Sequence, residues 1–251
     1  MTGPHIIVHR NADVLAASAA ARLVTTLVDA QSTKDSASVV LTGGGVGIAM
    51  LAQLRRSPAC EAIDWSRLDL YWGDERFVPA DDAERNELQA REALLNHVPV
   101  DPARVHAMAA SDGEFGDDPD RAADAYARLL AEHAGGRGTV PAFDVVLLGM
   151  GPEGHVASVF PESPAVYETE ASVVAVRNCP KPPPTRVSLT LPAIRHASEV
   201  WLLAAGEGKS DALALALSGA GEIQLPVAGA TGRARTLWLL DDPAATKLDH
   251  P

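Results

Sequence analysis

The sequence predicts an α/β fold, in which a mostly parallel β-sheet lies between two layers of helices. Short apolar runs alternate with amphipathic stretches rich in alanine and leucine along the chain, and this order favours crossover connections between parallel strands. The run FDVVLLGM (143–150) is almost continuously apolar, which is typical of a central strand that helices cover on both faces. These two observations define the class.

The first half of the chain supplies the clearest alternation. The run HIIV (5–8) predicts a strand, and apolar residues then recur at helical spacing over 12–30. The run SVVLT (38–42) is a second strand that ends in three glycines, and a helix is expected over 46–55. The run LDLYW (68–72) predicts a third strand, which a polar loop follows.

The second half continues the same pattern. Helices are expected over about 84–95, 120–133 and 208–218, and further strands over 143–150, 172–176, 199–205 and 236–240. The stretches 111–120 and 180–184 are rich in glycine, aspartate or proline and predict loops. Because no long linker divides the chain, we expect one domain spanning residues 1–251.

Charge and cysteine content exclude several functional classes. The chain carries 21 Lys and Arg against 33 Asp and Glu, a formal net charge of −12. Lys and Arg supply the contacts to nucleic-acid phosphates and anionic membranes, so neither partner is expected. Cys60 and Cys179 lie far apart and form no metal-binding pair, so no metal site is expected. With no signal peptide or membrane span visible, a reduced cytoplasmic protein is expected.

Ligands of such sheets bind at the carboxyl ends of the strands. The first loop at such an end, LTGGGVG (41–47), frees backbone N–H groups at the start of a helix, which suits an anion. It matches neither a dinucleotide fingerprint nor a phosphate loop of the GxxxxGK[ST] type, and a tight structural turn is the alternative interpretation. The second loop (71–90) places Asp74, Glu75 and Arg76 after a strand, where Arg76 could bind phosphate or carboxylate. A solvent-exposed charged loop is the alternative interpretation of this run.

The third loop, LLGMGPEGHVASVFP (147–161), carries the histidine that we expect to be catalytic. His155 follows a buried strand, at a position where a helix is expected to begin. Glycines at 149, 151 and 154 indicate close approach of a substrate. Histidine is the usual general base near neutral pH, although a lone histidine is more often structural.

Together these loops resemble the 6-phosphogluconolactonase family, whose relatives include the glucosamine-6-phosphate deaminases. The resemblance covers nearly the whole chain, through TGGG (42–45), WGDERFVP (72–79), LLGMGPEGHVASVFP (147–161), TRVSLTLPAI (185–194) and GKSDAL (208–213). It implies a Rossmann-like three-layer α/β/α fold without metal or organic cofactor. It also implies hydrolysis of 6-phosphoglucono-δ-lactone, the second step of the oxidative pentose phosphate pathway.

The resemblance also implies roles for individual residues. His155 is the expected general base, and the expected substrate contacts are Gly43, Gly44, Arg76, Asn86, Gly151, Arg186 and Lys209. Two positions depart from the family pattern: Glu153 stands where Asp is common, and Arg85 replaces a serine. The departures leave open how the histidine is oriented and whether residue 85 contacts substrate.

The chemistry of a lactone fits these residues. A lactone is a cyclic ester, so its hydrolysis needs an activated water and a proton for the departing ring oxygen, and His155 could serve both steps. Loop N–H groups near Gly44 or Gly151, or an arginine, could stabilise charge on the carbonyl oxygen. The chain has no G-x-S-x-G motif, so water is the expected nucleophile.

The sequence distinguishes a lactonase from two alternatives, an isomerase or deaminase and a non-catalytic sensor. A sugar-phosphate isomerase or deaminase would carry Asn-Glu-Pro after Gly-His, where this chain reads VASVFPES. A non-catalytic sugar-phosphate sensor usually carries a DNA-binding module, for which no segment is available. The lactonase interpretation makes a spatial prediction: Arg76, Arg186 and Lys209 should surround one cleft with His155 at its wall. The oligomeric state, monomer or homodimer, is left open.

Overall fold

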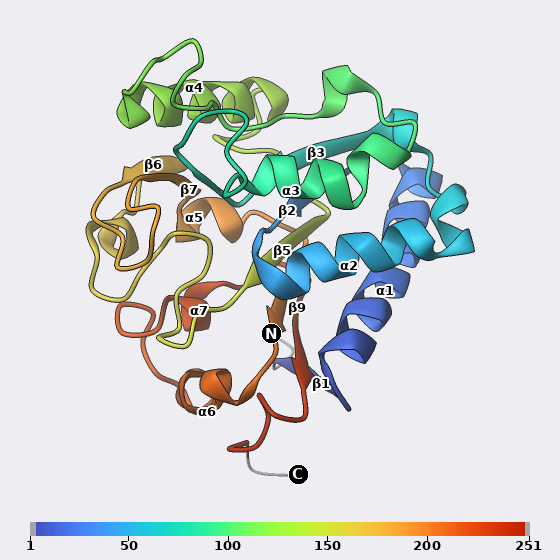
Figure 1. Ribbon diagram of the computed structural model, residues 1–251, viewed down its shortest axis with the longest axis vertical. Coiled ribbons are helices and arrows are strands. Elements are labelled where there is room, and N and C mark those ends of the chain that lie inside the picture. Colours follow the sequence, from blue (N-terminus) through green and yellow to red (C-terminus); the bar gives the residue numbers. More distant parts are fainter. Residues whose placement is uncertain (1–3, 249–251) are drawn as a thin grey trace.

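A six-stranded parallel sheet forms the centre of the molecule. The computed structural model describes residues 4–248 (Figure 1). In spatial order the strands are β1 (His5–His9), β9 (Arg235–Asp241), β8 (Glu199–Ala204), β5 (Val145–Gly149), β2 (Ala37–Leu41) and β3 (Leu68–Trp72), and every pairing is parallel. The predicted α/β class, with a mostly parallel sheet, is therefore confirmed.

Helices cover both faces of this sheet, as Figure 1 shows. One face packs against α1 (Ala12–Thr33), α2 (Gly44–Arg56) and α3 (Asn86–Ala93). The other packs against α4 (Pro119–His133), α5 (Leu191–Ile194), α6 (Ser210–Leu217) and α7 (Pro226–Gly229). Adjacent strand residues alternate between the two cores, as the pleat of a strand requires: Val39 belongs to the first core and Val40 to the second. The result is a three-layer α/β/α arrangement.

Short 3₁₀ helices connect several elements. They are η1 (Pro58–Ala62), η2 (Trp65–Arg67), η3 (Leu95–His97), η4 (Pro102–Arg104), η5 (Pro164–Tyr167) and η6 (Glu207–Lys209). Side-chain caps fix where the long helices begin. Asn11 accepts a hydrogen bond from the backbone N–H of Val14 at the start of α1, and Asp118 caps α4 in the same way.

A second sheet was not expected. It is antiparallel, in the order β4 (Asp74–Arg76), β7 (Arg186–Leu189) and β6 (Val173–Val176). The strand predicted at 172–176 is real, but it belongs to this sheet and not to the parallel one. Its four residues are too few to indicate their partner, and the charged sequence of β4 carries no strand signal. The small sheet brings two distant segments of the chain together.

The prediction that a helix begins at His155 is wrong. Residues 150–160 form turns held by isolated bridges from Val156 to Met150 and to Val159, and the next helical turn is η5. Closely spaced glycine and proline disfavour a helix in this segment. None of the helices within residues 4–248 has the length and apolar content of a membrane span. Cys60 and Cys179 are buried free thiols.

Candidate active site

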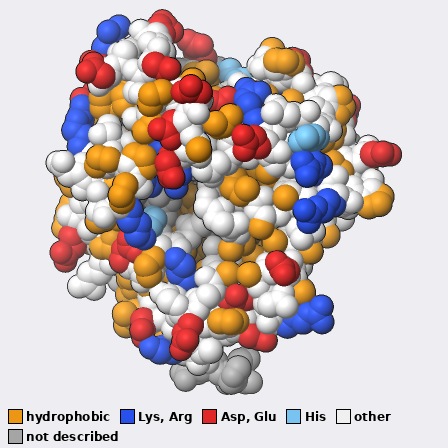
Figure 2. Space-filling view, in the orientation of Figure 1, with side chains coloured by type: hydrophobic (Ala, Val, Ile, Leu, Met, Phe, Trp, Pro, Cys, Tyr) orange, Lys and Arg blue, Asp and Glu red, His pale blue; other side chains and the backbone are white. Residues whose placement is uncertain are grey.

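A cleft of about 410 Å³ lies where the carboxyl ends of the parallel strands meet the small sheet. Its lining includes each residue that the sequence assigned to the site: Gly43, Gly44, Arg76, Asn86, Gly151, His155, Arg186 and Lys209. Figure 2 shows basic side chains and a histidine gathered around a hollow on this face. The three basic residues expected to converge do therefore share one cleft, on a chain whose net charge is −12.

The glycine turn leaves the first turn of α2 open to the cleft. No side chain caps this helix, and its first turn holds no acidic residue. A Cβ added to Gly44 or Gly45 would meet nothing within 4 Å, whereas one added to Gly43 would lie 1.9 Å from Asn86 Oδ1. Gly44 also has a φ of +79°, which glycine adopts readily. The turn therefore presents backbone N–H groups and a helix dipole to an anion.

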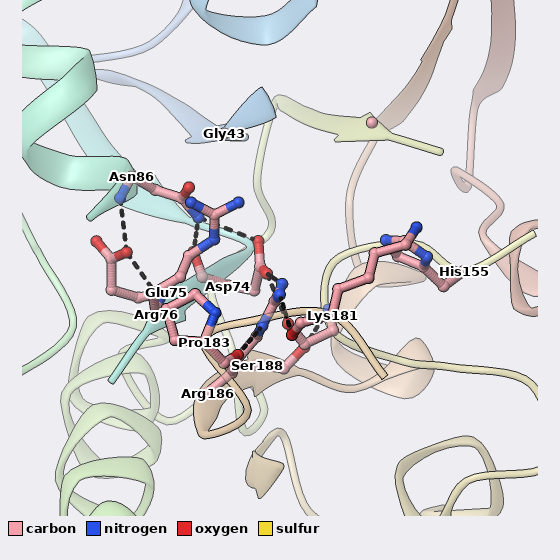
Figure 3. Close-up of polar contacts among 12 residues, drawn as sticks. Gly43, Asp74, Glu75, Arg76, Asn86, His155, Lys181, Pro183, Arg186 and Ser188 are labelled. Carbon is pink, nitrogen blue, oxygen red and sulfur yellow. Dashed lines mark hydrogen bonds and ion pairs between the residues drawn. The ribbon is translucent and has the colours of Figure 1, made fainter. Parts of the chain in front are cut away.

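Asp74, in β4, lines the cleft and contacts three other segments of the chain. It is 6% exposed, and its Oδ2 accepts a hydrogen bond of 2.7 Å from Ser158 Oγ. Asn86 Nδ2 donates to the backbone oxygen of Asp74 over 2.8 Å. Arg186 Nη1 lies 3.9 Å from Asp74 Oδ2. Figure 3 shows Asp74 between Asn86 and Arg186, so both of these residues contact the same buried aspartate.

Arg186 is held in place by backbone carbonyls of the proline-rich loop. Its Nε donates to Pro183 O over 3.1 Å, and its Nη2 is 3.1 Å from Lys181 O and 3.3 Å from Pro182 O. The side chain is only 6% exposed. The remaining Nη1 has Asp74 as its nearest charged neighbour and lies at the cleft. The guanidinium is thus fixed before any ligand binds.

Arg76 faces Arg186 across β4 and β7, which are paired at these residues. Its Nη1 donates to Glu84 O over 2.5 Å, and the carboxylate of Glu84 is 3.5 Å away. Its Nε is buried without a hydrogen-bond partner in the described part of the chain. A buried donor without a partner is costly, so this nitrogen indicates where an anionic group could bind.

His155 and Glu153 form a hydrogen-bonded pair at the cleft. Figure 3 shows His155 beyond Lys181, on the side away from Asn86. His155 Nδ1 lies 2.9 Å from Glu153 Oε1, and the imidazole packs on Phe160 with ring centroids 4.4 Å apart. Gly151 makes room for the ring, because a Cβ there would lie 2.0 Å from Nδ1. With Nδ1–H donating to the carboxylate, Nε2 is left as the acceptor of a neutral imidazole.

Electrostatics at this part of the cleft favour a neutral histidine. Burial lowers the pKa of His155, and the neighbouring Glu153 carboxylate opposes that change. Burial also lowers the pKa of Lys209, and the nearby charge of Lys181 acts in the same direction. No carboxylate in residues 4–248 forms an ion pair with Lys209, which leaves its ammonium group for a ligand.

Sequence reasoning missed two contributors to the site. Lys181 lies in the stretch 180–184, which was interpreted only as a loop, yet it lines the cleft and its Nζ is 3.1 Å from Glu153 Oε2. Ser158 holds Asp74 although no motif marks it. The lysine between prolines was the available signal, since prolines restrict the direction of the chain.

The fold is that of a three-layer α/β/α protein with a cleft lined by basic residues, and the comparisons with known proteins identify the family. The family described as "Glucosamine-6-phosphate isomerases/6-phosphogluconolactonase" matches residues 10–238. The chain belongs to this family.

The most similar of the compared proteins are 6-phosphogluconolactonases. The chain is 63% identical to the 6-phosphogluconolactonase of Streptomyces coelicolor over 98% of its own length and 95% of that protein. It is 56% identical to the 6-phosphogluconolactonase of Mycobacterium tuberculosis, covering 95% and 96% of the two chains. A solved 6-phosphogluconolactonase from Trypanosoma brucei matches with a TM-score of 0.86 at 30% identity over 99% and 100% of the chains. A monomeric glucosamine-6-phosphate deaminase, with a TM-score of 0.78 and 20% identity, shares the fold.

Proposed function

We propose that this protein hydrolyses 6-phospho-D-glucono-1,5-lactone to 6-phospho-D-gluconate, with water activated by His155. The observation that carries the proposal is the cleft itself, in which a neutral, carboxylate-paired histidine faces a group of cations. The names of relatives at 63% and 56% identity support the substrate. The reaction is an ester hydrolysis that needs a base, a fixed carbonyl and an acid for the leaving oxygen.

His155 is the proposed base and then the proposed acid. Its Nδ1–H is committed to Glu153, so Nε2 can accept a proton from water as the water attacks the lactone carbonyl. The resulting imidazolium is stabilised by the carboxylate of Glu153. The imidazolium then returns the proton to the ring oxygen as the C–O bond breaks, which leaves a free hydroxyl and a carboxylic acid that loses its proton to solvent at neutral pH.

The phosphate is proposed to bind among Arg76, Arg186 and Lys209, with Gly43, Gly44 and Asn86 beside it. Arginines held by backbone carbonyls can offer charge-assisted hydrogen bonds in a fixed direction. The open first turn of α2 adds backbone donors. Charge on the carbonyl oxygen in the transition state would be stabilised by nearby donors, of which the N–H groups around Gly44 and Gly151 are candidates.

The test is lactone hydrolysis in a coupled assay that generates the lactone from glucose 6-phosphate. The wild-type protein should accelerate opening above the spontaneous rate, and His155→Ala should lower kcat by roughly 10²- to 10⁴-fold. His196→Ala, an exposed histidine outside the cleft, is the matched control.

Each outcome selects one interpretation. Near-normal turnover in folded His155→Ala would refute the role of the histidine. Binding of the phosphorylated ligand without turnover by the wild-type protein would favour a sensor, and release of ammonia or a ketose would favour the isomerase class.

A further inference from the structure

We propose that Glu75 and Arg85, neither of which lines the cleft, are positioning residues that hold Arg76 and Asn86 in place for the phosphorylated substrate. The inference rests on the proposed function and extends it to a buried layer behind the site. It arises from a departure in the sequence, because Arg85 occupies a position where the family commonly has serine.

One carboxylate ties β4 to the start of α3. Glu75 Oε1 accepts hydrogen bonds from the backbone N–H of Arg76 at 2.8 Å and of Asn86 at 2.7 Å. Its Oε2 accepts one of 2.9 Å from the N–H of Glu87. From β4, Glu75 therefore accepts hydrogen bonds at the N-terminus of α3 while also holding the backbone of Arg76 (Figure 3). The two cleft residues are braced by a single side chain.

Arg85 places a positive charge next to the Glu75 carboxylate. It is 1% exposed, and its Nη2 lies 3.6 Å from Glu75 Oε2 and 3.2 Å from Glu87 Oε2. Nη2 also donates to Met108 O, but Nε and Nη1 have no partner within the described residues. An apolar side chain of similar volume often stabilises a buried site as well as an ion pair does, or better. Stability alone therefore does not account for this arginine.

The presence of a buried arginine at position 85 is better explained by its effect on the charge of Glu75. Only a carboxylate can accept from all of these N–H groups, since a protonated oxygen turns its own hydrogen toward a donor. Burial raises the pKa of Glu75 to about 7, and the charge of Arg85 is the main influence that opposes the rise. The other groups facing Glu75 are Glu87 on α3, whose charge is of the same sign, and the Tyr126 phenol on α4. Arg85 therefore extends to lower pH the range in which the Glu75 carboxylate is charged.

The experiment measures KM for the phosphorylated lactone against pH, with the uncatalysed rate subtracted. In Arg85→Met, Glu75 loses its counter-charge, so its pKa should rise above the value of about 7 in the wild type. As the pH is lowered, KM should therefore begin to rise at a higher pH in the variant than in the wild type. The expected rise at pH 7 is about tenfold, with a smaller change in kcat. Arg85→Lys keeps a charge and should restore much of the wild-type profile.

Two controls separate this role from a structural one. Glu75→Gln has no ionisable group at position 75, so its KM should be raised at every pH. The remaining pH dependence of its KM should be that of the ionisation of the substrate. Arg177→Met removes an exposed arginine that pairs with Asp120 and should leave the pH profile unchanged. An Arg85→Met protein that is folded by circular dichroism and has the wild-type KM profile would overturn the inference. Absence of lactone hydrolysis by the wild-type protein would instead overturn the proposed function.

Discussion

Alanine at position 151 should displace His155, the proposed general base, without removing it. A Cβ on Gly151 would lie 2.0 Å from His155 Nδ1 and 2.2 Å from Cε1. Ordinary contacts begin at 3.4 Å, so the ring must retreat by about 1.4 Å. The same Cβ would lie 2.8 Å from Glu153 Oε2, which prevents the carboxylate from following the ring unchanged. Misplacing a reacting group by about 1 Å costs about 10²-fold in rate, and we expect that loss in kcat.

The assay compares Gly151→Ala with Gly221→Ala, an exposed glycine whose added Cβ would meet nothing within 4 Å. Overpacking should also lower the free energy of unfolding by about 1–3 kcal/mol, which thermal unfolding measures. The control should retain both rate and stability. A folded Gly151→Ala enzyme with kcat within about threefold of the control would refute the assignment of the reaction to this histidine.

Two further variants test the anion contacts and the histidine pair. Arg186→Ala should weaken binding of the phosphorylated lactone about 10- to 100-fold, because hydrogen bonds to charged groups contribute about 1.5–3 kcal/mol. An equal loss on an unphosphorylated lactone would show that Arg186 does not contact phosphate. Glu153→Gln removes the charge that opposes the lowered pKa of His155, so the acidic limb of the kcat/KM profile should move to lower pH while kcat falls. An acidic limb that stays in place would contradict this pairing.

Local patterns in the sequence predicted the large sheet and three loops of the cleft, whereas Asn86, Arg186 and Lys209 were expected there from the family resemblance. Each expected strand of the parallel sheet is a short apolar run whose neighbours in the chain are amphipathic, so burial and chain direction both follow from the sequence. The loops at their carboxyl ends must then share one edge of the sheet. That geometry explains why the positions of Gly43, Arg76 and His155 in the sequence are enough to predict that they share a site.

The small sheet and the buried layer depend on contacts between distant segments. β4 is Asp-Glu-Arg, and its pairing with β7 joins residues that are 110 or more positions apart. No local periodicity encodes such a pairing. Likewise, Glu75 in a charged run indicates solvent exposure, whereas the structure buries it against three backbone N–H groups. Its role depends on α3 lying beside it.

The carbonyl cradle around Arg186 has a consequence for the thermodynamics of binding. Immobilising a long side chain at an interface costs about 0.5–1.5 kcal/mol, and a flexible arginine would incur that cost when the ligand arrives. Here the proline-rich loop imposes the order during folding, through Pro183, Lys181 and Pro182. Less of the binding free energy of the proposed anionic ligand is then spent on ordering Arg186, and this corner of the cleft should have the same conformation in the free and the occupied protein.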